Sequence, residues 1–203
     1  MATVKNGRIS KQAIIDQLDN RPIVLVGMMG CGKSSVGRRL AARLGLEFVD
    51  ADTEIERAAG MSIPDIFERH GEDDFRSGER RVIARLIGEG KLRVIATGGG
   101  AFINDETRAL IKDKAVSVWL KAEFDVLMQR VRRKADRPML KTADPEATMR
   151  SLLAQRNPVY AKADITVVTE HGPHQKVVGR ILSALSRHLK MQTKPEGAKE
   201  KTA

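Results

Sequence analysis

The stretch Gly27-Met28-Met29-Gly30-Cys31-Gly32-Lys33-Ser34 decides the fold of this chain of 203 residues. It fits the phosphate-binding pattern G-x-x-x-x-G-K-[ST], and it stands between the apolar run 23–26 and a segment, 35–44, with helical periodicity. Glycines here let successive backbone N–H groups turn inward and form a nest for phosphate oxygens at the positive end of the helix. The pattern predicts a site for ATP or GTP; a glycine-rich turn that binds nothing is the weaker alternative.

Three side chains of this loop have distinct chemical uses. Lys33 supplies a mobile positive charge for the β- and γ-phosphates, and the hydroxyl of Ser34 is placed to ligate Mg²⁺. Cys31 lies inside the expected nest beside Lys33, where a thiol ionises more easily. We therefore expect either a reactive cysteine that bound ATP shields or, on the simpler interpretation, a small residue that fits the loop.

The composition is that of an ordinary globular protein, with 41% hydrophobic and 31% charged residues. A single cysteine excludes an internal disulfide framework, and no Cys/His cluster has the spacing of zinc ligands. No uncharged stretch approaches the ~20 apolar residues that span a membrane, and the N-terminus lacks the apolar segment of a secretory signal. We therefore expect a cytoplasmic protein with no membrane partner.

The net charge of +10 has two interpretations. A nucleic-acid-binding protein would use this charge on phosphates, but it usually adds aromatic stacking residues or a recognisable reading motif, and only 3% of this chain is aromatic. An enzyme with anionic substrates and a solvated basic face also carries such a charge. The phosphate loop favours the enzyme, so we expect no nucleic acid as a partner.

Apolar runs of strand length alternate along the chain with segments of helical periodicity. The expected strands are residues 23–26, 46–49, 91–97, 115–120 and 165–168. The expected helices include 35–44, 62 to about 71, 73–88 and 174–189, and others that begin near 104 and 123 or end near 157. This alternation predicts an α/β domain whose parallel sheet is covered on both faces and binds ligands at the carboxyl ends of its strands.

Two acidic residues follow the second expected strand. Asp50 and Asp52 are two positions apart, so in an extended segment both point to the same side, where one could hold a metal and the other meet an acceptor hydroxyl. Many phosphate-loop proteins end a later strand with an acidic residue, but here the third strand runs into glycines, so Asp50 is the natural replacement. A turn and a helix N-cap are the simpler interpretation of the pair.

Two further features have both a structural and a functional interpretation. Gly98, Gly99 and Gly100 let a ligand approach the backbone and offer N–H donors, but a tight turn explains them equally well. Arg76 and Glu79 lie one turn apart on the same expected helix face, and a surface ion pair of small energy is the simpler interpretation. Taken alone, neither feature names a substrate.

Six further segments complete a pattern. In chain order they are Phe48-Val49-Asp50-Ala51-Asp52, Ser62-Ile63-Pro64-Asp65-Ile66-Phe67, Phe75-Arg76-Ser77-Gly78-Glu79, Gly98-Gly99-Gly100-Ala101, Arg137-Pro138-Met139-Leu140 and Arg156-Asn157-Pro158-Val159-Tyr160. With the phosphate loop, they make the chain similar to the shikimate kinases over about residues 23–180. These small phosphate-loop enzymes transfer a phosphoryl group from ATP to the 3-hydroxyl of shikimate, on the route to chorismate and the aromatic amino acids.

The resemblance implies a phosphate-loop kinase fold, with three α/β/α layers around a five-stranded parallel sheet in the order 2-3-1-4-5. It implies an ATP-dependent phosphotransferase that uses Mg²⁺, with ATP and shikimate as small-molecule partners, and we expect a monomer. The alternatives are a related small-molecule kinase, such as a gluconate kinase, and a non-catalytic nucleotide-dependent nucleic-acid-binding protein. Arg76, Arg156 and the three glycines argue against a gluconate kinase because together they match the site of a rigid cyclic acid.

The resemblance also assigns acceptor-binding residues by position. It implies that Arg76 and Arg156 hold the shikimate carboxylate and that Glu79 orients Arg76. Asp52 matches the residue that meets the ring hydroxyls and is the family's proposed catalytic base. The other positions matched to shikimate binding are Gly98, Gly99, Gly100, Phe67 and Phe75.

On the nucleotide side, Ser34 and Asp50 match the Mg²⁺ positions. Lys33 and Arg137 match catalytic residues that neutralise charge on the transferred phosphoryl group. The segment between Arg133 and Arg137 is short, so the arginine that contacts adenine is either Arg132 or Arg133. The positions matched to ATP binding are Gly30, Cys31, Gly32, Lys33, Ser34, Ser35, Arg133 and Arg137.

We expect three parts in the chain. Residues 1–21 form an N-terminal extension with a possible short helix after Ser10, a suitable N-cap. Residues 22–190 form the kinase domain, and the charged segment 132–145, with two prolines and no periodicity, is expected to be its mobile lid. Residues 191–203 have the composition of a disordered basic tail.

Overall fold

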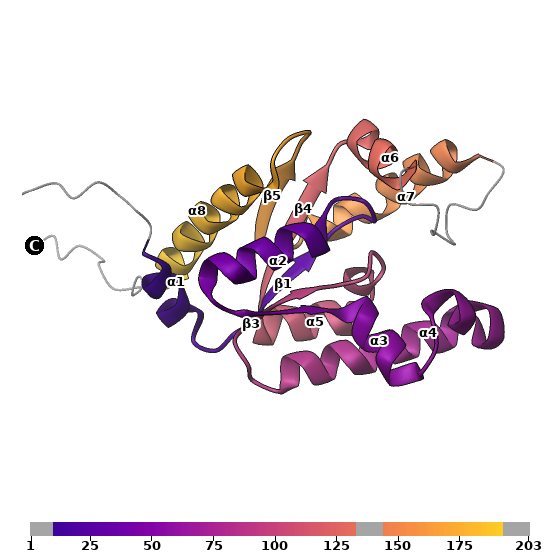
Figure 1. Ribbon diagram of the computed structural model, residues 1–203, viewed down its shortest axis with the longest axis horizontal. Helices are drawn as coiled ribbons and strands as arrows, with labels where there is room; N and C mark the ends of the chain where they lie inside the picture. The colour runs from indigo at the N-terminus through magenta and orange to yellow at the C-terminus, as the bar shows by residue number, and fades with distance from the viewer. Residues whose placement is uncertain (1–9, 133–143, 193–203) are drawn as a thin grey trace, which may run out of the picture.

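The computed structural model describes residues 10–132 and 144–192. Its sheet contains five strands in the order β2-β3-β1-β4-β5, and every neighbouring pair is parallel (Figure 1). The strands are β1 (Ile23–Val26), β2 (Glu47–Asp50), β3 (Arg93–Ala96), β4 (Val116–Ala122) and β5 (Ile165–Thr169). The predicted α/β class and strand order are confirmed.

Helices cover both faces of this sheet. They are α1 (Lys11–Leu18), α2 (Lys33–Leu44), α3 (Ala51–Ala59), α4 (Ile63–Gly88), α5 (Asp105–Lys114), α6 (Phe124–Arg132), α7 (Pro145–Tyr160) and α8 (His174–Gln192), with a 3-10 turn, η1 (Ala101–Ile103). On one face α2 packs against β1, β2 and β3 and against α8, which in turn contacts β5. On the other face α5 contacts β4 and α4, and Figure 1 shows α4 running beside α5.

The burial of the strands explains their sequence pattern. All four residues of β1 and all four of β3 are buried, because helices cover both sides of the central strands. The edge strand β5 instead alternates buried and exposed residues. The register sets Leu25 opposite Ala96, so β1 and β3 end level with each other and their following loops meet at one edge. One of these loops is the phosphate loop and the other contains the three glycines.

A bend in α4 shapes the end of the molecule that lies next to these loops. The sequence predicts two helices separated near Gly71, and this glycine, at φ 82° and ψ 178°, is the non-helical residue within α4. The hydroxyl of Ser62 accepts a hydrogen bond from the N–H of Asp65, which is the expected N-cap. The bend brings Phe67 of the first segment against Phe75 of the second, with ring centroids 4.6 Å apart.

The two ends of the described chain differ slightly from expectation. Ser10 caps α1 as predicted, and Ile14 and Leu18 are buried where α1 packs against α8. Helix α8 runs to Gln192, so the first two residues of the expected tail are helical, and residues 193–203 lie outside the described residues. None of the described helices combines the length and the apolar character that crossing a bilayer requires.

Candidate active site

The phosphate loop has the backbone that its glycines predict. Gly30 (φ 80°) and Gly32 (φ 99°) are in the left-handed region, and a side chain at Gly30 would also meet Val131 of α6 at 2.9 Å. Among the described residues, no acceptor receives the N–H of either glycine. The first N–H groups of α2 likewise have no partner within the helix. The two glycines and the first turn of α2 therefore present free N–H donors at a helix N-terminus, as an anion site requires.

The Lys33 ammonium group is held directly above this loop. Its Nζ donates to the carbonyl oxygen of Gly27 at 2.7 Å and to that of Met28 at 3.1 Å. A bound phosphate would be a stronger acceptor than either carbonyl because the hydrogen bond would then be charge-assisted on both sides. The geometry thus keeps the cation at the position where an anion would arrive.

A pocket of about 510 Å³ opens over the loop. Its walls include Lys33 and Ser34 at the start of α2, Asp50 at the end of β2, Asp52 in α3 and Gly98 after β3. The pocket brings together three of the strand ends that the sequence predicted to meet. Ser35 lines it as well.

The two aspartates reach this pocket by a route that differs from the prediction. Asp50 is the N-cap of α3, and its Oδ1 accepts the N–H of Asp52 at 3.2 Å. Asp52 therefore lies in the first turn of a helix, so the argument from an extended spacing of two was wrong. The simpler interpretation, a helix cap, is correct for Asp50 and coexists with its place in the pocket wall.

A smaller hollow of about 100 Å³ adjoins this pocket. The two share Met29, Asp52, Gly98 and Gly99 as lining residues, so they form neighbouring compartments of one site. Every position that the resemblance matched to shikimate binding lines the hollow, namely Asp52, Phe67, Phe75, Arg76, Gly98, Gly99, Gly100 and Arg156.

The pair Arg76 and Glu79 is not the surface ion pair of the simpler interpretation. Glu79 is only 2% exposed, and its Oε2 accepts from Nη1 of Arg76 at 2.9 Å. Burial raises the pKa of Glu79 above its ordinary value, and the positive charge of Arg76 opposes that shift. Within the described chain, the second oxygen of Glu79, Oε1, has no hydrogen-bond partner. This buried carboxylate fixes the arginine while one of its oxygens remains unsatisfied.

The three glycines are needed because charged side chains approach their backbone. A Cβ on Gly98 would lie 2.5 Å from Oε1 of Glu79 and 3.0 Å from Oδ1 of Asp52. A Cβ on Gly100 would lie 2.3 Å from Nη1 of Arg76. In the described part of the chain, none of the three glycine N–H groups donates to a protein acceptor. A tight turn alone is therefore not a sufficient explanation, since the glycines make room for the acidic and basic groups of the hollow.

Arg156 completes the hollow from α7. Its Nη1 lies 3.4 Å from the carbonyl oxygen of Gly99, to which the hydroxyl of Tyr160 also donates. The helix continues three residues beyond the expected end at Asn157, with Pro158 in its last turn. As a result Arg156 and Tyr160 lie on the same helix face, one turn apart.

The sequence missed one arginine on the nucleotide side. Arg130 of α6 lines the larger pocket, where its Nη1 donates to the carbonyl of Cys31 at 3.2 Å and its Nη2 to that of Glu170 at 2.9 Å. Arg132, one of the two expected arginines, instead pairs with Glu146, and it does not line this pocket. Arg133, the other expectation, lies outside the described residues, as does Arg137.

Two histidines close the same end of the pocket. His171 and His174 precede or begin α8 and line the pocket with Arg130. Burial lowers the pKa of His174, and the charges of Arg39 and Arg130 lower it further. Cys31 is only 1% exposed, which favours the simpler interpretation of a residue that fits the loop. Its reactivity with and without ATP stays a prediction.

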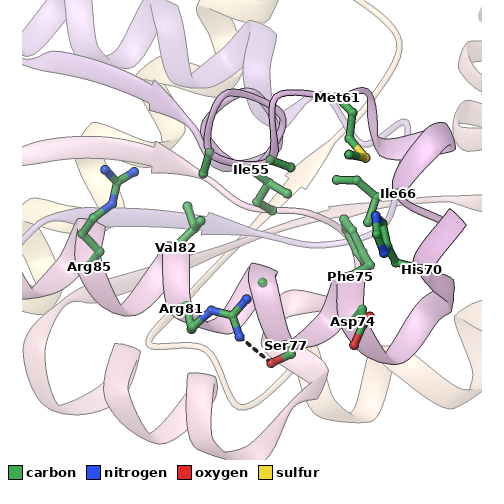
Figure 2. A pocket seen from close by; sticks show the side chains of 13 residues that line it. Ile55, Met61, Ile66, His70, Asp74, Phe75, Ser77, Arg81, Val82 and Arg85 are labelled. Atoms are coloured by element: carbon green, nitrogen blue, oxygen red, sulfur yellow. Dashed lines mark hydrogen bonds between the residues drawn. The ribbon is translucent and has the colours of Figure 1, made fainter.

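A hollow of about 710 Å³ lies apart from these residues, between α3 and α4. Figure 2 shows its apolar side chains, including Ile55, Met61 and Val82, between the two helices, with Arg81 at its edge. It contains no phosphate-loop residue, and its shared wall with the acceptor hollow is Phe75. Its lining includes the charged residues Asp74, Arg81 and Arg85, but neither the glycines 98–100 nor the Arg76–Glu79 pair of the smaller site.

Comparisons with known proteins agree with this geometry. The family model described as shikimate kinase matches residues 29–186. A shikimate kinase of Bradyrhizobium diazoefficiens is 62% identical over 176 residues, covering 87% of this chain and 84% of the relative, and one of Rhodopseudomonas palustris is 56% identical over 188 residues, covering 92% of each.

A solved structure gives the same result. The shikimate kinase of Acinetobacter baumannii in complex with shikimate superimposes with a TM-score of 0.81 at 38% sequence identity, over 91% of this chain and 100% of that one. The model match covers well over half of the chain, and the curated relatives exceed half identity over most of its length. The chain therefore belongs to the shikimate kinase family.

Proposed function

We propose that this protein transfers the γ-phosphoryl group of ATP to the 3-hydroxyl of shikimate and releases shikimate 3-phosphate and ADP. The observation that carries the proposal is the shared wall between the two compartments. Asp52 and Gly98 line both the pocket above the phosphate loop and the hollow that contains Arg76 and Arg156. A carboxylate-bearing acceptor in the hollow would have a hydroxyl close to the nucleotide, which is the arrangement that phosphoryl transfer needs.

The nucleotide is proposed to bind through the loop. The free N–H groups of Gly30 and Gly32 and those of the first turn of α2 would bind the β- and γ-phosphates, and Lys33 would exchange its two carbonyl acceptors for phosphate oxygens. We assign the far end of the pocket, with Arg130 and His174, to the base and ribose, since these lie beyond the loop. Arg133 and Arg137 remain proposals from the resemblance.

The residues around the loop fit a bound Mg²⁺. Ser34 and Asp50 both line the nucleotide pocket, and Asp50 uses Oδ1 for the cap, which leaves Oδ2 for a ligand. Among the described residues there is no cluster of three His, Cys, Asp or Glu side chains suited to a metal. Mg²⁺ bound with ATP needs no such cluster, because phosphates and water supply most of its ligands. When bound, the ion would neutralise charge on the β- and γ-phosphates.

The acceptor is proposed to bind by its carboxylate and its ring. Arg76 and Arg156 provide two guanidinium groups for one carboxylate, while the free N–H groups of the three glycines supply further donors. Phe67 and Phe75 form the apolar wall that the ring of the acceptor would contact.

Asp52 is proposed to accept the proton of the attacking hydroxyl. It lies in both compartments and so is the carboxylate between acceptor and nucleotide. Lys33 stabilises the charge that develops on the transferred group, and Arg137 of the expected lid is proposed to do the same. Closure of that lid would exclude water from the transfer.

The two alternative functions explain the residues of the site less well. A gluconate kinase shares the phosphate loop but not the need for the two arginines and three glycines around a rigid cyclic acid. A nucleic-acid-binding protein would explain the charge of +10 but not a hollow with a buried carboxylate and oriented arginines. Binding that falls steeply with salt, without acceptor-dependent ADP release, would favour this second rival.

Calorimetric titration with shikimate tests the acceptor assignment. We expect Arg76→Ala to weaken shikimate binding by about tenfold to a hundredfold, the loss of a charge-assisted hydrogen-bonded contact, and to leave ATP binding near its normal value. Arg81→Ala is the matched control, because Arg81 follows on the same helix but bonds to Ser77 and lies outside the hollow. An effect of Arg76→Ala confined to ATP would show that the assignment is wrong.

We also propose a monomer in the cytoplasm, with residues 22–190 as the kinase domain and 132–145 as its lid. Light scattering coupled to size-exclusion chromatography checks the mass in solution against 22.4 kDa.

A further inference from the structure

Tyr160 is a buried phenol that the proposed chemistry does not use. It is the only tyrosine of the chain, lies at the end of α7 and is 1% exposed. Its ring packs against that of Trp119 on β4, with centroids 5.9 Å apart. Burial raises the pKa of its hydroxyl, so the group stays protonated and remains a donor. A buried hydroxyl needs partners, and both of its partners belong to the acceptor hollow.

The first partner is the backbone of the glycine triplet. The hydroxyl of Tyr160 donates to the carbonyl oxygen of Gly99. The second is Arg156, which is hydrogen-bonded to the phenol and whose Nη1 also approaches the same carbonyl at 3.4 Å. Tyr160 is thus one corner of a triangle whose other two corners line the hollow.

The Gly99 carbonyl controls the direction of the next donor. A trans peptide is planar, with C=O and N–H pointing in opposite directions, so a carbonyl held toward Tyr160 turns the N–H of Gly100 away from it. Between two glycines the peptide rotates with little steric resistance, because neither residue has a side chain to restrict it. In the described residues, the carbonyl of Gly99 receives bonds from Tyr160 and Arg156, while the N–H of Gly100 donates to no protein atom.

We propose that Tyr160 is a positioning residue whose hydroxyl fixes the Gly99–Gly100 peptide and the guanidinium of Arg156 in the orientation that receives the carboxylate of the acceptor. The role in binding rests on the proposed function, whereas the effect on the peptide does not. The ring is held by Trp119 and by burial, so its hydroxyl is a fixed point rather than a mobile one. The substitution Tyr160→Phe would keep the packing of the ring and remove the hydroxyl group.

The variant Tyr160→Phe tests the proposal, with Ser117→Ala as its control. The hydroxyl of Ser117 is also buried and also makes two hydrogen bonds, at 2.6 and 2.9 Å to Asp164, and among the described residues it has no hydrogen bond to the acceptor hollow. Both variants therefore lose a buried hydroxyl, and only one of them touches the glycines. Comparing the two variants separates the general effect of losing a buried hydroxyl on stability from a change in the orientation of the Gly99–Gly100 peptide.

Two readouts are measured on both variants. In spectra of protein labelled with ¹⁵N-glycine, which reports on 17 glycines, we expect the signals of Gly99 and Gly100 to shift or broaden in Tyr160→Phe and to stay unchanged in Ser117→Ala. By calorimetry, we expect shikimate to bind about tenfold more weakly to Tyr160→Phe, equivalent to about 1.4 kcal/mol, with ADP binding within about twofold of normal.

A single tyrosine also allows a second test that keeps the phenol hydroxyl in place. Growth with 3-fluorotyrosine labels position 160 alone, makes the phenol more acidic and strengthens its donation. We expect the signals of Gly99 and Gly100 to move while most others stay. If Tyr160→Phe does not fold, this measurement still tests whether the hydroxyl of Tyr160 fixes the Gly99–Gly100 peptide.

The outcomes are distinct. Unchanged glycine signals in both altered proteins would overturn the fixing of the peptide. Altered signals with normal shikimate affinity would overturn the role in binding. If the normal protein binds no shikimate, the proposed function fails, and the glycine signals still decide whether Tyr160 holds the peptide.

Discussion

Replacing Gly100 by alanine should impair acceptor binding far more than it impairs folding. The backbone at Gly100 has φ −92° and ψ −21°, which alanine adopts without strain. The new Cβ, however, would lie 2.3 Å from Nη1 and 2.7 Å from Cζ of Arg76. Since carbon contacts are comfortable at about 3.5 Å, the guanidinium must move by about 1 Å or more.

The energetic consequences follow from what the guanidinium leaves behind. An arginine side chain swings away at little cost in strain, but the 2.9 Å bond to Glu79 would be lost, and the other oxygen of Glu79 already has no partner in the described chain. Leaving this carboxylate unpaired costs about 1–3 kcal/mol, offset by about 0.4–1 kcal/mol because alanine restricts the unfolded chain. We expect a net loss of about 1–2 kcal/mol in the free energy of unfolding.

The loss in binding should be larger. With Arg76 displaced, the carboxylate loses a charge-assisted partner worth about 1.5–3 kcal/mol, so the KM for shikimate should rise about tenfold to 150-fold while the KM for ATP changes little. The assay is ADP release at saturating ATP over a series of shikimate concentrations, together with urea unfolding.

Gly88→Ala is the matched control for this substitution. Gly88 ends α4, and no atom of the described residues lies within 4 Å of the Cβ that alanine would add there. We expect normal kinetics and unchanged or slightly raised stability. A normal KM for shikimate in Gly100→Ala would refute the reasoning, because it would mean that Arg76 does not hold the acceptor or does not need the space above Gly100.

Three further results are expected. Asp52→Asn should lower kcat by orders of magnitude with little change in ATP binding, and near-normal turnover would remove Asp52 from the role of base. Because burial raises the pKa of Glu79 above 4.5, the folded protein holds the proton of this carboxyl more tightly than the unfolded chain does. The free energy of unfolding should therefore fall as the pH rises from 4.5. Urea unfolding at several pH values should show a shallower fall in Glu79→Gln. Arg130→Ala should raise the KM for ATP several-fold while Arg132→Ala leaves it normal; equal effects would contradict the placement of Arg130 in the nucleotide pocket.

Much of the fold could be predicted because its signals are local. The strands of this sheet are short apolar runs, the breaks fall at glycines, and the caps fall at Ser10 and Ser62. Gly71 was recognised as a helix end, and the structure has its non-helical backbone there. The meeting of the phosphate loop with Gly98 follows from one rule, that parallel strands end at one edge.

The features that were missed depend on packing between segments. The packing of α4 against Gly98 decides whether the ion pair of Arg76 and Glu79 is buried or exposed. The i,i+3 spacing in the sequence carries no information about this packing. Arg130 was missed because the rotation of α6 about its axis decides which arginine faces the loop.

A strong local signal also misled the prediction in two places. Asn157-Pro158 indicated the end of a helix, so Tyr160 was not placed on the face of Arg156, whereas α7 continues through Pro158 to Tyr160. Asp52 was taken as extended because Asp50 follows a strand, whereas Asp50 caps a helix that begins at once.

In the proposed reaction, the two compartments bind ATP and shikimate together. The most direct measurement is ADP release with ATP and Mg²⁺ over a panel of acceptors that includes shikimate, gluconate, other hydroxy acids, sugars and nucleotides, with identification of the phosphorylated product. We expect saturable ADP release that depends on shikimate, with the new phosphate ester on its 3-hydroxyl and little release with the other acceptors. Equal release without an acceptor, or a preference for gluconate, would contradict it.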